Sequence, residues 1–132
     1  MPRRLTVVLA GAHAALFVAW TTPLHGSPPT GGARVSVPQA IASSVPVWSA
    51  AFGLTAVLLL IALLNRRWGS WAHAVAFVSV ASYAAASLSS SLLQRPLGSV
   101  VTAVAFLTLG GCHLLAQRAY RALPVSDRKA SR

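Results

Sequence analysis

The chain has 132 residues, of which 55% are hydrophobic and 9% are charged, and its formal net charge is +10. A water-soluble domain normally has about 25% charged residues, so this composition favours a protein that lies in lipid. The sequence holds one acidic residue, Asp127, which excludes paired-carboxylate catalysis, carboxylate metal sites and carboxylate proton relays. The arginines lie mostly at the ends of apolar segments, and no nucleic-acid-binding motif accompanies them, so we expect no nucleic-acid partner.

Four apolar segments without an acidic residue follow one another, at about 5–22, 47–64, 71–93 and 97–116. Each approaches the roughly 20 residues that a helix needs to cross the hydrocarbon core of a bilayer. The sequence therefore predicts an all-α integral membrane bundle of four transmembrane helices within residues 1–122. The first segment also resembles a signal peptide, whose cleavage would leave three spans, but its length favours a retained helix.

The connection at 23–46 contains five prolines and three glycines, so it cannot form an uninterrupted helix. We expect a flexible outer loop whose second half, 35–45, is apolar enough to form a short interfacial turn or helix. After the fourth segment, the helix should continue to about Ala122. Residues 123–132 then form a disordered basic tail.

The segment at 71–93 is rich in alanine and serine, many of them four residues apart. In hydrocarbon, small residues at this spacing let helix backbones approach and let hydroxyl groups bond across helices. We therefore expect this helix to pack against its neighbours or a second copy. The alternative is that its serines bond carbonyls of their own helix. The predicted packing or pore face comprises Ser79, Ser82, Ala86, Ser89 and Ser90.

Nine of the eleven basic residues lie before the first segment, between the second and third, and after the fourth. Cytoplasmic connections carry such an excess of Lys and Arg, so we expect a cell-membrane protein with both termini in the cytoplasm. Its basic tail would contact anionic lipid headgroups. The residues that set this topology are Arg3, Arg4, Arg66, Arg67, Arg118 and Arg121. Aromatic residues near the segment ends are expected as interfacial anchors: Trp20, Trp48, Trp68, Trp71 and Tyr120.

Three histidines, His13, His73 and His113, lie in three of the predicted helices. One interpretation is a haem or a metal ion held between helices. The other treats His73 and His113 as interfacial residues and His13 as a hydrogen-bonded core residue. Because no acidic residue is available to orient a ligating imidazole, we favour the second interpretation. We predict no metal, cofactor or catalytic residue.

The length, the four segments, the cationic tail and a composition rich in Ala and Arg but nearly free of Lys together resemble small four-helix holins and membrane proteins of actinobacteria and their phages. This resemblance implies a lysis pore assembled from several copies, and it assigns no role to any residue. The residues themselves favour a non-enzymatic accessory or structural subunit that forms homo-oligomers or joins a larger membrane complex. The alternatives are the holin-like pore and a haem-binding or transporter subunit.

Overall fold

The computed structural model describes residues 2–22, 36–44, 46–94 and 97–123. Within these ranges the chain is helical and has no strand, which confirms the all-α prediction. The elements are α1 (Pro2–Thr21), α2 (Val37–Ser44), α3 (Val47–Leu64), the short 3-10 helix η2 (Arg66–Trp68), α4 (Gly69–Gln94) and α5 (Leu97–Arg121). The predictions for the loop at 23–35 and the tail at 124–132 lie outside the described residues.

The helices coincide with the predicted apolar segments but extend beyond three of them. α1 begins at Pro2, α4 begins at Gly69 after η2, and α5 continues to Arg121, close to the predicted end of the last helix. The second half of the outer connection forms α2, as the apolar composition of 35–45 allowed.

Four helical stretches of the described chain are long and apolar enough to cross a membrane: Pro2–Thr21, Val47–Leu64, Arg66–Leu93 and Val100–Arg121. Their outward faces are also apolar, since Leu54, Val78 and Val104 are each more than half exposed. A water-soluble bundle would place polar side chains on these faces. The surface therefore fits a lipid environment as well as the composition does.

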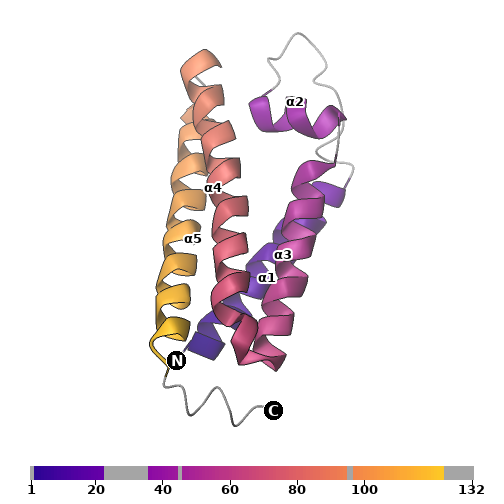
Figure 1. The fold of residues 1–132 in the computed structure, drawn as a ribbon. Helices are drawn as coiled ribbons and strands as arrows, with labels where there is room; N and C mark the ends of the chain where they lie inside the picture. Colours follow the sequence, from indigo (N-terminus) through magenta and orange to yellow (C-terminus); the bar gives the residue numbers. More distant parts are fainter. Residues whose placement is uncertain (1, 23–35, 45, 95–96, 124–132) are drawn as a thin grey trace.

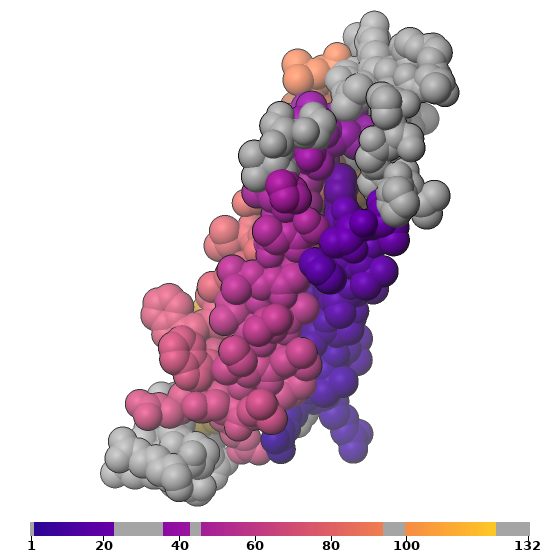
Figure 2. Space-filling view, turned by 90° about the vertical axis from the view of Figure 1, so that its right-hand side faces the viewer, coloured from indigo at the N-terminus to yellow at the C-terminus, as the bar shows by residue number. Residues whose placement is uncertain are grey.

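The bundle consists of two helix pairs, α1 with α3 and α4 with α5, which join mainly through α3 and α4 (Figure 1). Figure 2 shows α1 and α3 side by side along their length. The start of α1, the end of α3, the start of α4 and the end of α5 meet at one end of the bundle. α2 lies across the opposite end and contacts α3 and α4.

Small residues bring α4 and α5 close together. Ala76 and Ala84 on α4 and Ala103 on α5 are fully buried. At Gly110 on α5 a Cβ atom would lie 3.4 Å from the side chains of Phe77 and Val80 on α4. In lipid, such close approach of backbones supplies the van der Waals contact that holds helices together.

The α2 end is filled by an aromatic cluster beneath α2, formed by Trp48, Phe52, Tyr83 and Phe106. Tyr83 packs against Trp48 and Phe106 with ring centroids 5.0 and 4.3 Å away. The Trp48 indole N–H donates to the carbonyl of Pro38 at 2.9 Å, and the Ser90 hydroxyl accepts from the Val37 amide at 2.7 Å. These two bonds attach α2 to α3 and α4.

All six arginines among the described residues lie at the other end, which we call the arginine end. The Arg3 guanidinium donates to the carbonyl of Leu63 at 3.0 Å and so caps the last turn of α3. The Arg121 guanidinium donates to the hydroxyl of Ser70 at 3.1 Å. Each bond joins the two helices of one pair at this end, α1 to α3 and α4 to α5.

Candidate functional site, a buried histidine network

The three histidines of the predicted helices come together in the half of the bundle near the arginine end. His13 on α1, His73 on α4 and His113 on α5 are each 0% exposed. The interpretation of His73 and His113 as interfacial residues was therefore wrong. α4 begins about one turn before His73 and α5 continues about two turns past His113, so both imidazoles lie inside the bundle and face its interior.

The three imidazole rings form a continuous series of contacts through their nitrogens. The Nε2 atom of His13 lies 3.0 Å from Nε2 of His113. The other nitrogen of His113, Nδ1, lies 3.0 Å from Nδ1 of His73. His113 is therefore the central ring and uses both of its nitrogens to join α1 to α4.

Hydroxyl groups lie at both ends of this series. The Thr55 hydroxyl of α3 lies 2.7 Å from Nδ1 of His13. The Thr6 hydroxyl of α1 lies 3.0 Å from Nε2 of His73 and 3.1 Å from the Tyr120 hydroxyl of α5. We call these six residues the histidine network: Thr6, His13, Thr55, His73, His113 and Tyr120.

Each contact between the rings and the two threonines can hold one donated proton. A neutral imidazole has one N–H donor and one acceptor nitrogen, and four contacts join the three rings to each other and to two threonines. In one order Thr6 donates to His73 and the donation continues through His113 and His13 to Thr55. In the other order every bond runs in the opposite direction. All six ring nitrogens are satisfied in both orders without a net charge.

The threonine hydroxyls have alternative acceptors that allow both orders. When Thr6 does not donate to His73, it donates to the carbonyl of Pro2 at 2.9 Å. When Thr55 does not donate to His13, it donates to the carbonyl of Ala51 at 2.8 Å. Conversion between the orders takes up one proton at one threonine, moves one proton along each contact and releases one proton at the other threonine, and no ring has to turn over.

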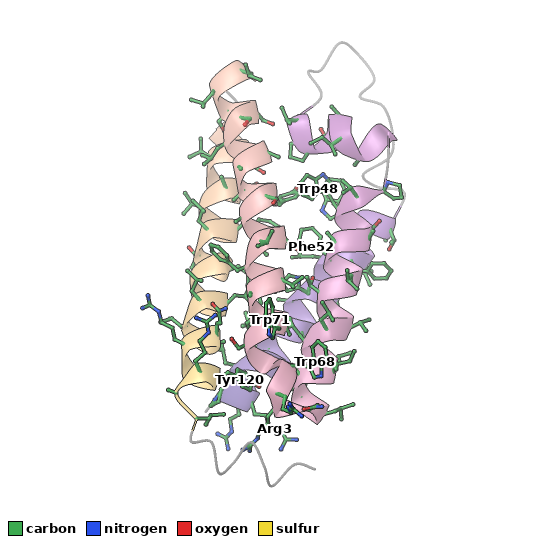
Figure 3. The ribbon with its side chains drawn as sticks, viewed as in Figure 1. Arg3, Trp48, Phe52, Trp68, Trp71 and Tyr120 are labelled. Atoms are coloured by element: carbon green, nitrogen blue, oxygen red, sulfur yellow. The ribbon has the colours of Figure 1, made fainter. Side chains whose placement is uncertain are left out.

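Apolar side chains enclose the network. Leu9, Leu59 and Ala76 belong to the buried apolar cluster of this half of the bundle. On the α2 side, the Phe52 ring packs edge-on against His13 with ring centroids 5.8 Å apart, and it continues into the aromatic cluster (Figure 3). The network is thus bounded by the aromatic cluster on one side, and Tyr120 and Thr6 form its end nearest the arginines.

The imidazole nitrogens do not converge as ligands of one metal ion do. His113 faces His13 with Nε2 and His73 with Nδ1, on opposite sides of its ring. Among the described residues, no group of three or more His, Cys, Asp or Glu is arranged to hold a metal ion. Cys112, which precedes His113, packs against the buried apolar cluster. Each ring nitrogen of the network has another imidazole or a threonine hydroxyl as its neighbour.

The predicted anchors lie in two kinds of environment. Trp68 and Trp71 are exposed at the arginine end, and Trp20 is half-buried. Trp48 and Tyr120 are instead buried, in the aromatic cluster and in the histidine network respectively. Both still lie near the ends of the bundle, but α2 covers Trp48 and α1 contacts Tyr120.

The predicted serine face of α4 divides in a similar way. Ser82 and Ser89 are exposed, Ser79 and Ala86 are half-buried, and Ser90 is buried beneath α2. The hydroxyls of Ser79 and Ser89 donate to Val75 and Ala85 in their own helix. The inward face of α4 shares only Ser90 with the predicted face and is formed by Ala72, His73, Ala76, Val80, Tyr83, Ala84, Ser87 and Ser90.

Sequence reasoning missed the network, although the spacing of its residues contains a signal. Thr6 and His13 are seven residues apart, as are His113 and Tyr120, and residues seven apart share a helix face. Two polar residues on one face of each of two apolar helices indicate that these faces meet. Comparisons of the chain with protein families, with curated proteins and with solved structures give no match.

Proposed function

We propose that this protein is a small, non-enzymatic membrane subunit that passes protons through its histidine network. In this proposal it crosses the cell membrane four times and its arginine end lies in the cytoplasm. The four apolar helices and the gathering of six arginines at one end support this orientation, because cytoplasmic connections are rich in Arg.

The observation that carries the proposal is the unbroken series of nitrogen and hydroxyl contacts across four helices, with distances between 2.7 and 3.1 Å. Ionisable residues inside a membrane are costly, and where they occur they commonly form ion pathways or proton relays. A proton that enters at Thr6 displaces one proton along each contact, and Thr55 releases one at the far end. The whole network then has the reverse order of bonds.

The release from Thr55 needs an acceptor. The Thr55 hydroxyl otherwise contacts the carbonyls of Ala51 and Phe52, and the Phe52 ring lies between the network and the α2 end. Water or a partner group reaches Thr55 when this ring moves aside.

Nitrogen-15 NMR of histidine-labelled protein in lipid bilayers tests the relay. We expect each ring nitrogen of His13, His73 and His113 to exchange between a protonated and an unprotonated form, because both orders of bonds are populated. The spectra are compared at about pH 6 and about pH 8, near the pH at which a free histidine titrates. If one fixed set of tautomers is present at both, the network serves only to hold the helices together.

The exposed face of α4 supports a second part of the proposal, association with another copy or a larger membrane partner. Ser82 and Ser89 lie seven residues apart and are exposed together, so they form a small-residue surface on which another helix can pack closely. Replacement of Ser82 by Leu should reduce the cross-linked oligomer in mild detergent. Lone monomers in the unmodified protein would contradict this part.

The same face also supports the holin-like alternative, in which several copies turn Ser82 and Ser89 toward a water-filled pore. Expression together with a cytoplasmic endolysin distinguishes the two functions. Lysis of the cells favours the pore, and intact cells with sealed membranes favour the subunit.

A further inference from the structure

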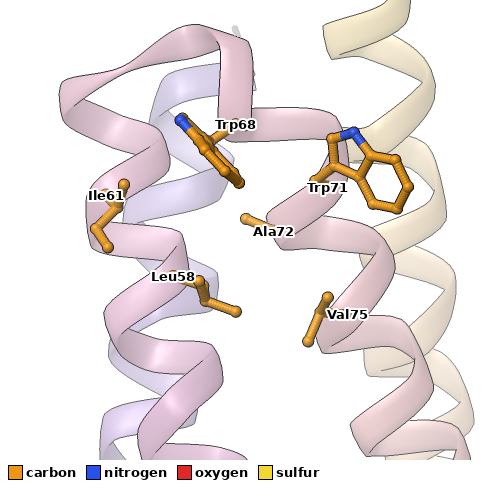
Figure 4. A pocket seen from close by; sticks show the side chains of 6 residues that line it. All are labelled: Leu58, Ile61, Trp68, Trp71, Ala72 and Val75. Carbon is orange, nitrogen blue, oxygen red and sulfur yellow. The ribbon is translucent and has the colours of Figure 1, made fainter.

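Two adjoining cavities of about 380 Å³ each open on the side of the bundle near the arginine end. Between α3 and α4, one is lined by Leu58, Ile61, Trp68, Trp71, Ala72 and Val75 (Figure 4). The other is lined by Asn65, Arg67, Trp68 and Trp71. Because the two indole rings line both cavities, the cavities form a single site, which we call the α3–α4 groove.

The first compartment of the groove is apolar and faces outward. Its floor is Ala72, which is 3% exposed, and its walls include Ile61 and Val75, which are about 40% exposed. An α-helix with its side chains is roughly 10 Å wide, too wide to enter a compartment of this volume. A single alkyl chain is narrow enough to lie between the two helices.

The second compartment contains the polar and cationic side chains of the groove, Asn65 and Arg67, beside the two indoles. The Asn65 side chain accepts a hydrogen bond from the Arg67 amide at 3.1 Å and so fixes the turn that carries Arg67. Among the described residues, neither the Arg67 guanidinium nor the indole N–H groups of Trp68 and Trp71 has a hydrogen-bond acceptor. Figure 4 shows the nitrogen edges of both indoles turned toward the η2 end of the groove.

We propose that the α3–α4 groove binds an anionic phospholipid, with one acyl chain between α3 and α4 and the phosphate at Arg67. The described residues include no Asp or Glu, so no side chain among them competes with a phosphate for the guanidinium. Basic pockets between membrane helices on the cytoplasmic side bind such headgroups, and indole rings favour this depth of the bilayer. The inference rests on the membrane insertion proposed above and is independent of the histidine network.

Tryptophan fluorescence in vesicles tests this site. The protein is placed in phosphatidylcholine vesicles that contain a small fraction of a brominated lipid, whose acyl chains quench nearby indoles. The brominated lipid is phosphatidylglycerol in one sample and phosphatidylcholine in the other. Subtraction of the signal of the Trp68→Phe/Trp71→Phe double variant isolates the two groove tryptophans from Trp20 and Trp48. We expect the brominated phosphatidylglycerol to quench them several-fold more strongly than the brominated phosphatidylcholine.

Two arginines of the same turn provide a matched pair of variants. Arg67→Gln should remove the preference for phosphatidylglycerol, whereas Arg66→Gln, which changes the net charge equally but does not line the groove, should keep it. Equal quenching by both lipids, or an equal loss in both variants, would overturn the site and leave only a general attraction to the surface. If neither lipid quenches any tryptophan, the protein is not in the bilayer, and the proposed function fails as well.

Discussion

The Nδ1 atoms of His73 and His113 lie 3.0 Å apart, although 40 residues separate them in the sequence. This contact joins α4 to α5 from inside the bundle, and the opposite nitrogen of His113 continues to His13 on α1. A change at His113 therefore affects three helices at once, whereas a change at either end of the network affects one contact with a neighbouring ring.

Thr55→Val should destabilise the bundle, because it leaves one nitrogen of His13 without a partner while it preserves the volume of the side chain. We expect a loss of about 1 kcal/mol, the usual size of a hydrogen bond between membrane helices or of one unsatisfied buried group. Unfolding in mixed micelles measures it. Thr55→Ser keeps the hydroxyl and should lie closer to the unmodified protein, and equal losses in both variants would contradict a role for this bond.

Gly69→Ala should disturb the network from a distance. A Cβ atom at position 69 would overlap the ring of Tyr120, so the ring must move and its hydroxyl leaves Thr6. We expect the nitrogen-15 signals of His73 to shift in the same direction as in Tyr120→Phe. Gly111→Ala is the matched control, since a Cβ at that position meets no atom within 4 Å.

Phe52→Ala should open a path between Thr55 and the α2 end. We expect vesicles with this variant to leak protons faster than vesicles with the unmodified protein, as reported by a pH-sensitive dye inside. The second change His113→Phe should suppress the leak, because it interrupts the network at its central ring. A leak that persists in the double variant would show that the protons bypass the histidines. Phe17→Ala, at a more exposed phenylalanine of α1, should cause no leak.

The arginine end should be labelled from the cytoplasmic side. After Cys112→Ser, the variants Arg4→Cys and Ala122→Cys place single thiols at the start of α1 and just beyond α5. A membrane-impermeant maleimide added to intact cells should label neither, and it should label both in inverted vesicles. Labelling of either thiol in intact cells would reverse the proposed orientation.

The sequence was sufficient for the helices, because bilayer-length apolar segments have few alternatives once water is excluded. The sequence also predicted that these arginines lie at one end of the bundle, because they fall in connections that successive spans bring to the same side. α2 was predicted only in part. The apolar stretch at 35–45 allowed a helix, but the position of this helix over Trp48 depends on the bond that Trp48 donates to Pro38 and the bond that Ser90 accepts from Val37. A tryptophan near a helix end suits the membrane interface and a buried cluster equally well, so the sequence does not distinguish the two positions for Trp48.

The histidine network could not be predicted from the residues alone. The burial of His73 depends on how far α4 is rotated about its axis, and its contact with His113 depends on the same rotation in α5. Small residues such as Ala76 and Gly110 set the distance between these helices. Neither the hydropathy nor the charge of the segments determines how far each helix is rotated about its axis. The seven-residue spacing of Thr6 and His13 identifies the face of α1 that lies inward, but it does not identify the helix that this face contacts.

The contacts between the two helix pairs differ at the two ends of the bundle, and this difference makes the half near the arginine end a hinge. Near the arginine end the two pairs are joined through the histidine network, in which Thr6 and His13 of α1 contact residues of α4 and α5. At the other end α2, a helix of eight residues, covers the aromatic cluster and bonds to both pairs. Detachment of α2 would leave the aromatic packing, such as that of Tyr83 against Trp48, to join the pairs there, so the pairs would separate at this end first, with the histidines at the pivot and their contacts intact.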